Sequence, residues 1–210
     1  MNSVSPSPRP PVAPSFSAAP AVQVKICGIT TPGDACLCVE AGAHAIGLVF
    51  HRRSTRCVTL GQAAAIARAV PDGFPLVGVF VGAAESEIRH AAEKLGLSAV
   101  QLHGSETPAL VADLRRAGHR VIKALFVGRP PGFDDAPLYP VDAILMEPGN
   151  GALPGGSGAA WGWAVPDGLR SGLPLVLAGG LHSGNVRDAI KTAQPDAVDL
   201  FELLLVAAAQ

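Results

Sequence analysis

The chain has 210 residues, of which 49% are hydrophobic and 16% charged, a composition typical of one compact domain of moderate size. The formal net charge is -1, and basic and acidic residues are mixed along the chain, so no patch for nucleic acid or an anionic membrane is indicated. No apolar run approaches the roughly 20 residues that cross a bilayer. We therefore expect no nucleic-acid partner and no membrane partner.

The first part of the chain, residues 1–21, is rich in Pro and Ser and has neither the basic start nor the apolar core of a secretory signal. Such a segment cannot bury enough apolar surface to fold, so a disordered tail is predicted there. Residues 22–210 are then predicted to form the single folded domain.

The four cysteines show no C-x-x-C pair and no Cys/His ligand spacing. Neither a zinc site nor a disulfide framework is therefore predicted, and no other metal site is indicated. Reduced thiols are typical of the cytoplasm, where we expect the protein. The cysteines are Cys27, Cys36, Cys38 and Cys57.

Eight short apolar runs, rich in β-branched residues, alternate with stretches of helical periodicity. Their continuous hydrophobicity predicts parallel strands that are covered on both faces, and their spacing of roughly 20 to 30 residues leaves room for one crossover helix each. The pattern predicts an α/β fold, a (β/α)8 TIM barrel. The runs are Val22–Ile26, Ala45–Val49, Leu76–Phe80, Ser98–Leu102, Val121–Leu125, Ala143–Met146, Leu175–Ala178 and Ala197–Leu200.

Helix starts support this register. Thr31 and Thr107 each precede a proline, which is the arrangement of an N-cap followed by Pro at the first helical position. The segment from Ala83 to Leu95 has an apolar stripe at helical spacing with charged residues on its other side, so a helix is predicted there.

Side chains at the C-terminal ends of barrel strands point into the active site, and this rule selects a short set of candidates. Each has an ordinary alternative, because a lone Cys is often a small buried hydrophobe, a His is often structural, and Arg or Glu is often solvated. Glu147 interrupts an apolar run and precedes Pro148, so its carboxylate is expected near the barrel mouth. The candidates are Cys27, Arg56, Gln101, His103, Glu147, Gly179, Gly180 and Asp199.

Two glycine clusters follow the sixth and seventh predicted strands. Exposed backbone N–H groups in such loops can bind a phosphate, and late loops are where barrel enzymes usually bind one. Tight turns also require glycine, so the clusters alone are weak indicators. They comprise Gly156, Ser157 and Gly158 in the first loop and Gly179 and Gly180 in the second.

Several motifs, in order and at matching spacing, resemble the phosphoribosylanthranilate isomerase family, whose members carry out an Amadori rearrangement in tryptophan biosynthesis. The similarity runs from Val24 to Asp199. It is carried by Lys25–Thr30, Gly42–Phe50, Ser54–Arg56, Gly78–Val81, Val100–Gly104, Val121–Ala124, Gly155–Gly158, Leu177–Leu181 and Asn185.

The resemblance implies that Cys27 is the general base and that Glu147 stands at the position of the general acid. It also implies that Arg56 contacts the anthranilate carboxylate, that Gln101, His103 and Asp199 contact the substrate, and that no metal or organic cofactor takes part. The chemistry requires a thiolate near neutral pH and a carboxyl that stays protonated. A small phosphoribosyl substrate and a monomer or homodimer are expected.

Two departures from the family pattern bear on function. Glu147 replaces an Asp, and an arm longer by one methylene displaces the acid by on the order of 1 Å, which can cost about a hundredfold in rate. Where the family has a Ser-Ser-Gly-Val-Glu phosphate loop and a last helix, this chain has 201–210, which is mostly apolar. The last βα unit is therefore expected to be incomplete, as an altered reading frame would make it.

Two other functions remain open at this point. The first is a catalytically impaired barrel that binds a phosphorylated ligand or a partner without turnover, which both departures favour. The second is an enzyme of a neighbouring barrel family, which the Lys25–Gly28 motif disfavours because those relatives commonly use Lys and Glu for acid–base work.

Overall fold

The computed structural model of the protein describes residues 22–149, 162–170 and 172–201. The predicted tail of residues 1–21, the glycine loop with Gly156, Ser157 and Gly158, and the segment 202–210 lie outside the described residues. The predictions made for them, including the incomplete last βα unit, therefore stay predictions.

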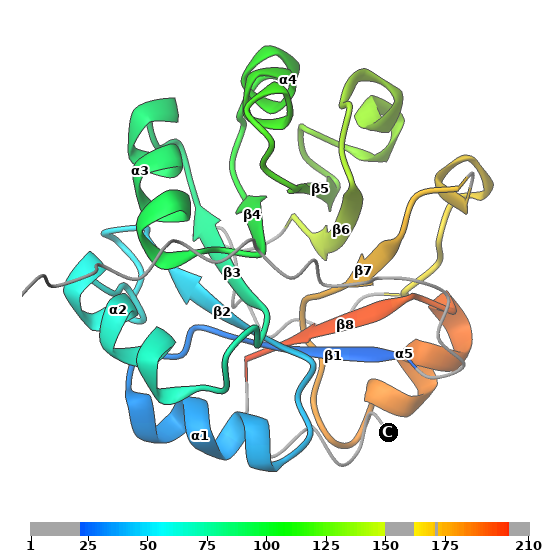
Figure 1. Cartoon of the computed structure of the whole chain (residues 1–210). Helices are drawn as coiled ribbons and strands as arrows, with labels where there is room; N and C mark the ends of the chain where they lie inside the picture. Colours follow the sequence, from blue (N-terminus) through cyan, green and yellow to red (C-terminus); the bar gives the residue numbers. More distant parts are fainter. Residues whose placement is uncertain (1–21, 150–161, 171, 202–210) are drawn as a thin grey trace, which may run out of the picture.

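Eight parallel strands form a closed barrel in which each strand pairs with the next along the chain and β8 pairs with β1 (Figure 1). The predicted (β/α)8 architecture is confirmed, and the strands coincide with the predicted apolar runs to within two residues. The strands are β1 Gln23–Cys27, β2 Ala45–Val49, β3 Leu76–Phe80, β4 Ala99–Leu102, β5 Val121–Val127, β6 Ala143–Pro148, β7 Leu175–Leu177 and β8 Ala197–Leu200.

Helices lie outside the ring of strands (Figure 1). The predicted caps are confirmed, because Thr31 accepts a hydrogen bond from the Asp34 N–H at 3.1 Å and Thr107 accepts one from Leu110 at 3.3 Å. Within the described residues there are five α-helices, with short 3₁₀ helices before β6 and β7. The helices are α1 Pro32–Glu40, α2 Leu60–Ala69, α3 Glu85–Leu95, α4 Pro108–Arg116, α5 Val186–Ala193, η1 Phe133–Leu138 and η2 Asp167–Arg170.

The barrel interior is filled by small and medium apolar side chains that alternate along the strands with residues facing the helices. On β1, Val24 and Ile26 pack into the outer core, so Lys25 and Cys27 face the interior. Toward the C-terminal ends of the strands the interior becomes polar, because Lys25, Gln101 and Asp199 are buried there. The fold thus concentrates polar groups at the end of the barrel where the sequence predicts the site.

A second buried polar group, outside the predicted site, joins two of the loops at this end of the barrel. Lys123 Nζ lies 3.0 Å from a carboxylate oxygen of Glu106 and donates to the Gly104 carbonyl at 2.7 Å. Glu106 in turn accepts hydrogen bonds from the N–H groups of Gly82 and Gly104, each at 2.9 Å. The pair therefore fixes the loops after β3 and β4, and with them the backbone next to His103.

The neighbours of Glu106 favour its ionised form. Burial raises the pKa of Glu106, but the Lys123 ammonium and the Gly82 N–H outweigh burial and hold that pKa below its ordinary value. A carboxyl whose pKa is lowered by folding stabilises the fold at neutral pH, and this contribution is lost as the pH falls through the folded-state pKa.

We expect Glu106→Ala to lower the free energy of unfolding by about 3–5 kcal/mol, because it leaves Lys123 buried without its counter-ion. The control is Lys191→Ala, which removes an exposed pair with Asp188 and should cost less than about 1 kcal/mol. Urea denaturation at neutral pH measures both. Equal losses in the two variants would contradict the role assigned to Glu106.

Candidate active site

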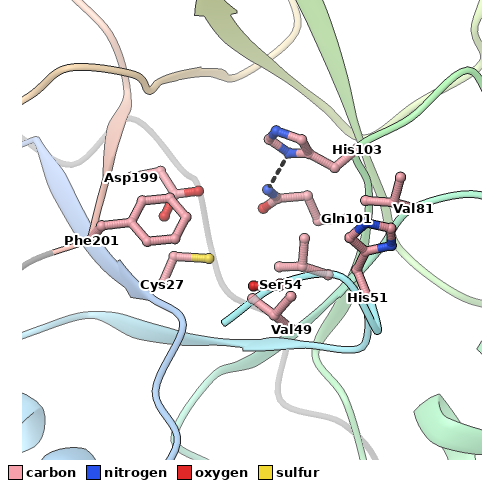
Figure 2. Close-up of a pocket in the computed structure, with 10 residues that line it drawn as sticks. Cys27, Val49, His51, Ser54, Val81, Gln101, His103, Asp199 and Phe201 are labelled. Atoms are coloured by element: carbon pink, nitrogen blue, oxygen red, sulfur yellow. Dashed lines mark hydrogen bonds between the residues drawn. The ribbon is translucent and has the colours of Figure 1, made fainter. Parts of the chain in front are cut away.

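A cavity at the C-terminal ends of the strands is lined by four of the residues predicted from the sequence. Figure 2 shows Cys27, Asp199 and Phe201 on one side of it and Gln101, His103 and His51 on the other. The remaining lining residues are Val49, Ser54, Val79 and Val81. The barrel therefore brings together residues from its first, fourth and eighth strands, as the strand-end rule predicts.

Cys27 is the last residue of β1, and its side chain is 1% exposed. Its partner in the register is Gly47 on β2, where an added Cβ would lie 2.7 Å from Cys27 Sγ and 3.0 Å from Lys25 Nζ. A glycine is therefore required at position 47 for the sulfur to occupy its place. The thiol is enclosed, as an ordinary buried cysteine is, but it faces a cavity lined by polar groups.

Opposing influences act on the pKa of the Cys27 thiol. Burial, with a further contribution from Asp199, raises the pKa of the thiol to about 12, although Lys25 acts in the opposite direction. Desolvation thus outweighs the neighbouring ammonium and disfavours the thiolate that the expected chemistry requires.

Glu147 lies on β6 and is 2% exposed, which excludes the alternative that it is a solvated acid. Its carboxylate is in close contact with Nε2 of His103. The amide nitrogen of Gln101 lies 3.1 Å from the other ring nitrogen of His103, so its donation there leaves the His103 proton on Nε2, facing Glu147. The three side chains form one hydrogen-bonded row from β4 to β6.

Lys25 is not among the residues predicted from the sequence, yet it is buried beside Cys27 and Asp199. Its Nζ donates to both carboxylate oxygens of Asp199 at 2.8 Å, and both side chains are buried. Burial lowers the pKa of Lys25, but Asp199 and Cys27 outweigh burial and leave that pKa raised. Side chains alternate between the two faces of β1, and this alternation could have indicated that Lys25 faces the interior. The pairing of Lys25 with Asp199 could not be predicted from the sequence.

Arg56 lies at the rim of the cavity rather than in a fully solvated loop. Its Nη1 donates to the backbone carbonyl of Phe201 at 2.6 Å and reaches the Cys27 carbonyl at 3.4 Å. Its guanidinium also lies over the Phe201 ring, 5.0 Å from the ring centre. The Arg56 guanidinium, which is predicted to contact the ligand, is therefore engaged by Phe201.

Gly179 and Gly180 follow β7 with φ angles of +82° and +66°. A Cβ at Gly179 would lie 2.1 Å from Cδ of Pro148, so this position requires glycine for backbone reasons alone. The alternative explanation, a tight turn, thus accounts for Gly179. A phosphate contact at the two glycines stays a prediction.

Other kinds of site receive no support from the part of the chain that the structure describes. No group of three or more His, Cys, Asp or Glu side chains there is arranged to hold a metal ion. No helix there is both long and apolar enough to span a bilayer. The four cysteines are free thiols.

An enclosed thiol and a carboxyl–imidazole pair at the mouth of one barrel can take up and release protons at a small ligand. Fold and site together define a TIM-barrel enzyme of the acid–base class. The model of the family described as N-(5'-phosphoribosyl)anthranilate isomerase matches residues 24–201. The chain belongs to this family of isomerases of tryptophan biosynthesis.

Individual relatives agree with this assignment. The N-(5'-phosphoribosyl)anthranilate isomerase of Desulfatibacillum aliphaticivorans is 45% identical over 179 residues, which cover 85% of this chain and 82% of that protein. A solved phosphoribosyl anthranilate isomerase in complex with reduced 1-(o-carboxyphenylamino)-1-deoxyribulose 5-phosphate is 36% identical, with a TM-score of 0.74 and coverage of 85% and 86%. A structure of monomers generated from the dimeric enzyme of Thermotoga maritima is 35% identical, with the same TM-score of 0.74 and the same coverage of 85% and 86%.

We expect Gly47→Ala to reduce isomerase turnover by about a hundredfold, because the added methyl group displaces the Cys27 sulfur by on the order of 1 Å. Gly162→Ala is the control, since a Cβ there meets nothing within 4 Å. Steady-state kcat/KM measures the effect, and thermal unfolding verifies that both variants are folded. Unchanged turnover in folded Gly47→Ala would show that the position of the sulfur does not matter.

Proposed function

We propose that this protein isomerises N-(5'-phosphoribosyl)anthranilate to the carboxyphenylamino-deoxyribulose phosphate, with Cys27 as general base and Glu147 as general acid. The observation that carries the proposal is the placement of a buried thiol and a buried carboxyl at one barrel mouth in a member of this family. The reaction opens the ribose ring and shifts protons within one molecule without an external oxidant or reductant, so it calls for an acid and a base, and no metal or organic cofactor is proposed.

The acid acts first. Protonated Glu147 donates its proton to the ring oxygen of the ribose as the C1–O bond breaks, which leaves a cationic Schiff base on the open sugar. The carboxylate that remains is bonded by His103 Nε2, and this hydrogen bond stabilises the charge that Glu147 acquires.

The base acts second. Cys27 as thiolate removes the proton from C2, the C–H electrons form the C1–C2 double bond, and the Schiff-base nitrogen accepts the displaced electron pair. The resulting enolamine then tautomerises to the ketone. Burial raises the pKa of the Cys27 thiol to about 12 and so disfavours the thiolate, and the positive charge of the Schiff base favours the thiolate when it is needed.

Substrate contacts are proposed from the residues around the cavity. Arg56 binds the anthranilate carboxylate in a two-pronged contact after it leaves the Phe201 carbonyl. The side-chain oxygen of Gln101 supports a sugar contact, because it is buried and has no hydrogen-bond partner among the described residues. His103 and Asp199 line the same cavity, and Lys25 already engages both oxygens of Asp199.

The phosphate is proposed to bind at the backbone N–H groups of the loops after β6 and β7. The positive φ angles of Gly179 and Gly180 support this placement, since successive turns of this kind can point N–H groups toward an anion. Gly156, Ser157 and Gly158 are proposed to complete the phosphate site.

The cellular setting is proposed on similar grounds. Four free thiols in the described residues suit the reducing cytoplasm. A monomer or a homodimer is proposed, and the dimeric relative from Thermotoga maritima supports the homodimer.

We expect Cys27→Ala to abolish turnover of the fluorescent substrate N-(5'-phosphoribosyl)anthranilate while KM changes little, because the variant removes the base and leaves the substrate contacts. Cys57→Ala is the matched control at a half-buried thiol and should keep full activity. Complementation of a tryptophan auxotroph gives the same comparison in cells. Full turnover by Cys27→Ala would remove Cys27 from the mechanism.

We expect Glu147→Gln to lower kcat by at least about a hundredfold, because an amide cannot donate the proton that opens the ring. Glu147→Asp restores the side chain found elsewhere in the family and should keep more activity than Glu147→Gln. Stopped-flow measurement of substrate fluorescence separates the two variants. Equal kcat values for Gln and Asp at this position would contradict the role of a general acid.

A second function, ligand binding without turnover, is favoured by one observation. The Phe201 carbonyl engages the arginine that is proposed to bind the anthranilate carboxylate, and the Phe201 side chain lines the cavity beside Cys27. Calorimetric titration with the reduced product analogue tests this reading. Tight binding by a protein that neither turns over substrate nor supports growth without tryptophan would favour the binder over the isomerase.

A further inference from the structure

Three charged or ionisable groups from two adjacent strands meet at the cavity, which Cys27 and Asp199 line. Lys25 on β1 pairs in register with Asp199 on β8, and Cys27 follows two residues later on the same face of β1. The Lys25 ammonium and the Cys27 sulfur both lie within 3.0 Å of the point above Gly47 where a side chain would begin. The ammonium is thus placed between a carboxylate that it binds and the sulfur of the proposed base.

We propose that Lys25 is a positioning residue whose ammonium stabilises the Cys27 thiolate, and that Asp199 limits this effect by neutralising part of the charge of Lys25. This inference rests on the proposed role of Cys27 as the base. When the thiolate forms, the S–H bond breaks, the sulfur keeps the electron pair and the proton leaves to solvent. Lys25 remains an ammonium throughout and does not touch the substrate.

The groups that face Cys27 come from every side of the cavity. Burial, Asp199 and Glu147 raise the thiol pKa, whereas Lys25 lowers it. His103 and His51 line the same cavity, and Arg56 reaches the backbone carbonyl of Cys27 rather than its sulfur. Lys25 is therefore the neighbour through which the protein can favour the thiolate.

The stability of the barrel gives little reason for a charged pair at this place. The adjoining part of the interior is filled by apolar side chains such as Ala45, Val176 and Ala197. Burying two charges costs several kcal/mol of desolvation, and well-packed apolar residues often serve a core as well or better. The Lys25–Asp199 pair lies next to the Cys27 thiol, and the absence of a side chain at Gly47 leaves room for both the ammonium and the sulfur. The presence of this pair is therefore more readily explained by its effect on the sulfur.

The test exploits the opposite signs of the two charges. In a Cys36→Ser, Cys38→Ala, Cys57→Ser background, Cys27 is the only thiol, and its thiolate fraction is followed in the free protein by the rate at which iodoacetamide alkylates it at one mildly alkaline pH. Lys25→Met should lower this rate, and Asp199→Asn should raise it. A purely structural pair would not move it in opposite directions.

Turnover gives the second readout. Lys25→Met should lower kcat by at least about tenfold, the effect of one pKa unit on the thiolate fraction, with little change in KM. The double variant Lys25→Met, Asp199→Asn leaves no unpaired charge in the barrel and guards against misfolding of the single variant. The double variant should be alkylated more slowly than the Asp199→Asn variant and should keep the low kcat.

The outcomes separate this inference from the proposed function. Changes of the alkylation rate in the same direction in the two single variants, no change in Lys25→Met, or a normal kcat in the folded double variant would overturn the role of Lys25. Full turnover by Cys27→Ala would instead overturn the assignment of the base, and the alkylation rate, which needs no turnover, would still report how Lys25 and Asp199 act on the sulfur.

Discussion

The pairing of β8 with β1 is the constraint on which the site depends. It closes the barrel and joins side chains 174 positions apart in the sequence, because Lys25 and Asp199 are partners in the register. The same closure brings Phe201, just after β8, to Arg56 and into the cavity beside Cys27. Each of these contacts would be lost if the two strands separated, so the chemistry at β1 is tied to the integrity of the last strand.

Burial of the proposed base has two opposing consequences. It raises the pKa of Cys27 and so disfavours the thiolate, yet a thiolate formed in a dry cavity is a stronger base than one in water. A positive charge on the ligand can shift this balance only after the ligand is bound. The arrangement therefore links formation of the base to the presence of a reaction intermediate, and it limits reaction of the thiol with other molecules.

Local patterns in the sequence predict most of the fold. The strands follow from continuous apolar runs, and the starts of α1 and α4 follow from Thr31 and Thr107, because each of these signals acts within a few residues. Cys27 and Glu147 were predicted as site residues because strand ends and family motifs both select them. The structure places both residues, whereas their catalytic roles stay proposals.

Long-range partners explain what the sequence could not predict. Lys25 stands inside an apolar strand, and its importance becomes visible only when β8 lies beside it. Glu106 and Lys123 are 17 residues apart and meet only because the loop after β4 folds back over β5. The contact of Arg56 with Phe201 involves a residue at the point where the chain departs from the family pattern, so no motif indicates it.

The hydrogen bond that Arg56 makes to Phe201 occupies its guanidinium and also holds it in place for the proposed ligand contact. A hydrogen bond to a backbone carbonyl holds the guanidinium at the rim and limits the rotamers that it must lose on binding. A carboxylate offers two charged acceptors, and hydrogen bonds between ions are roughly twice as strong as bonds to neutral groups. In the proposed function, an anthranilate carboxylate would therefore displace the Phe201 carbonyl, and its arrival would free Phe201 to leave the cavity that the sugar is proposed to enter.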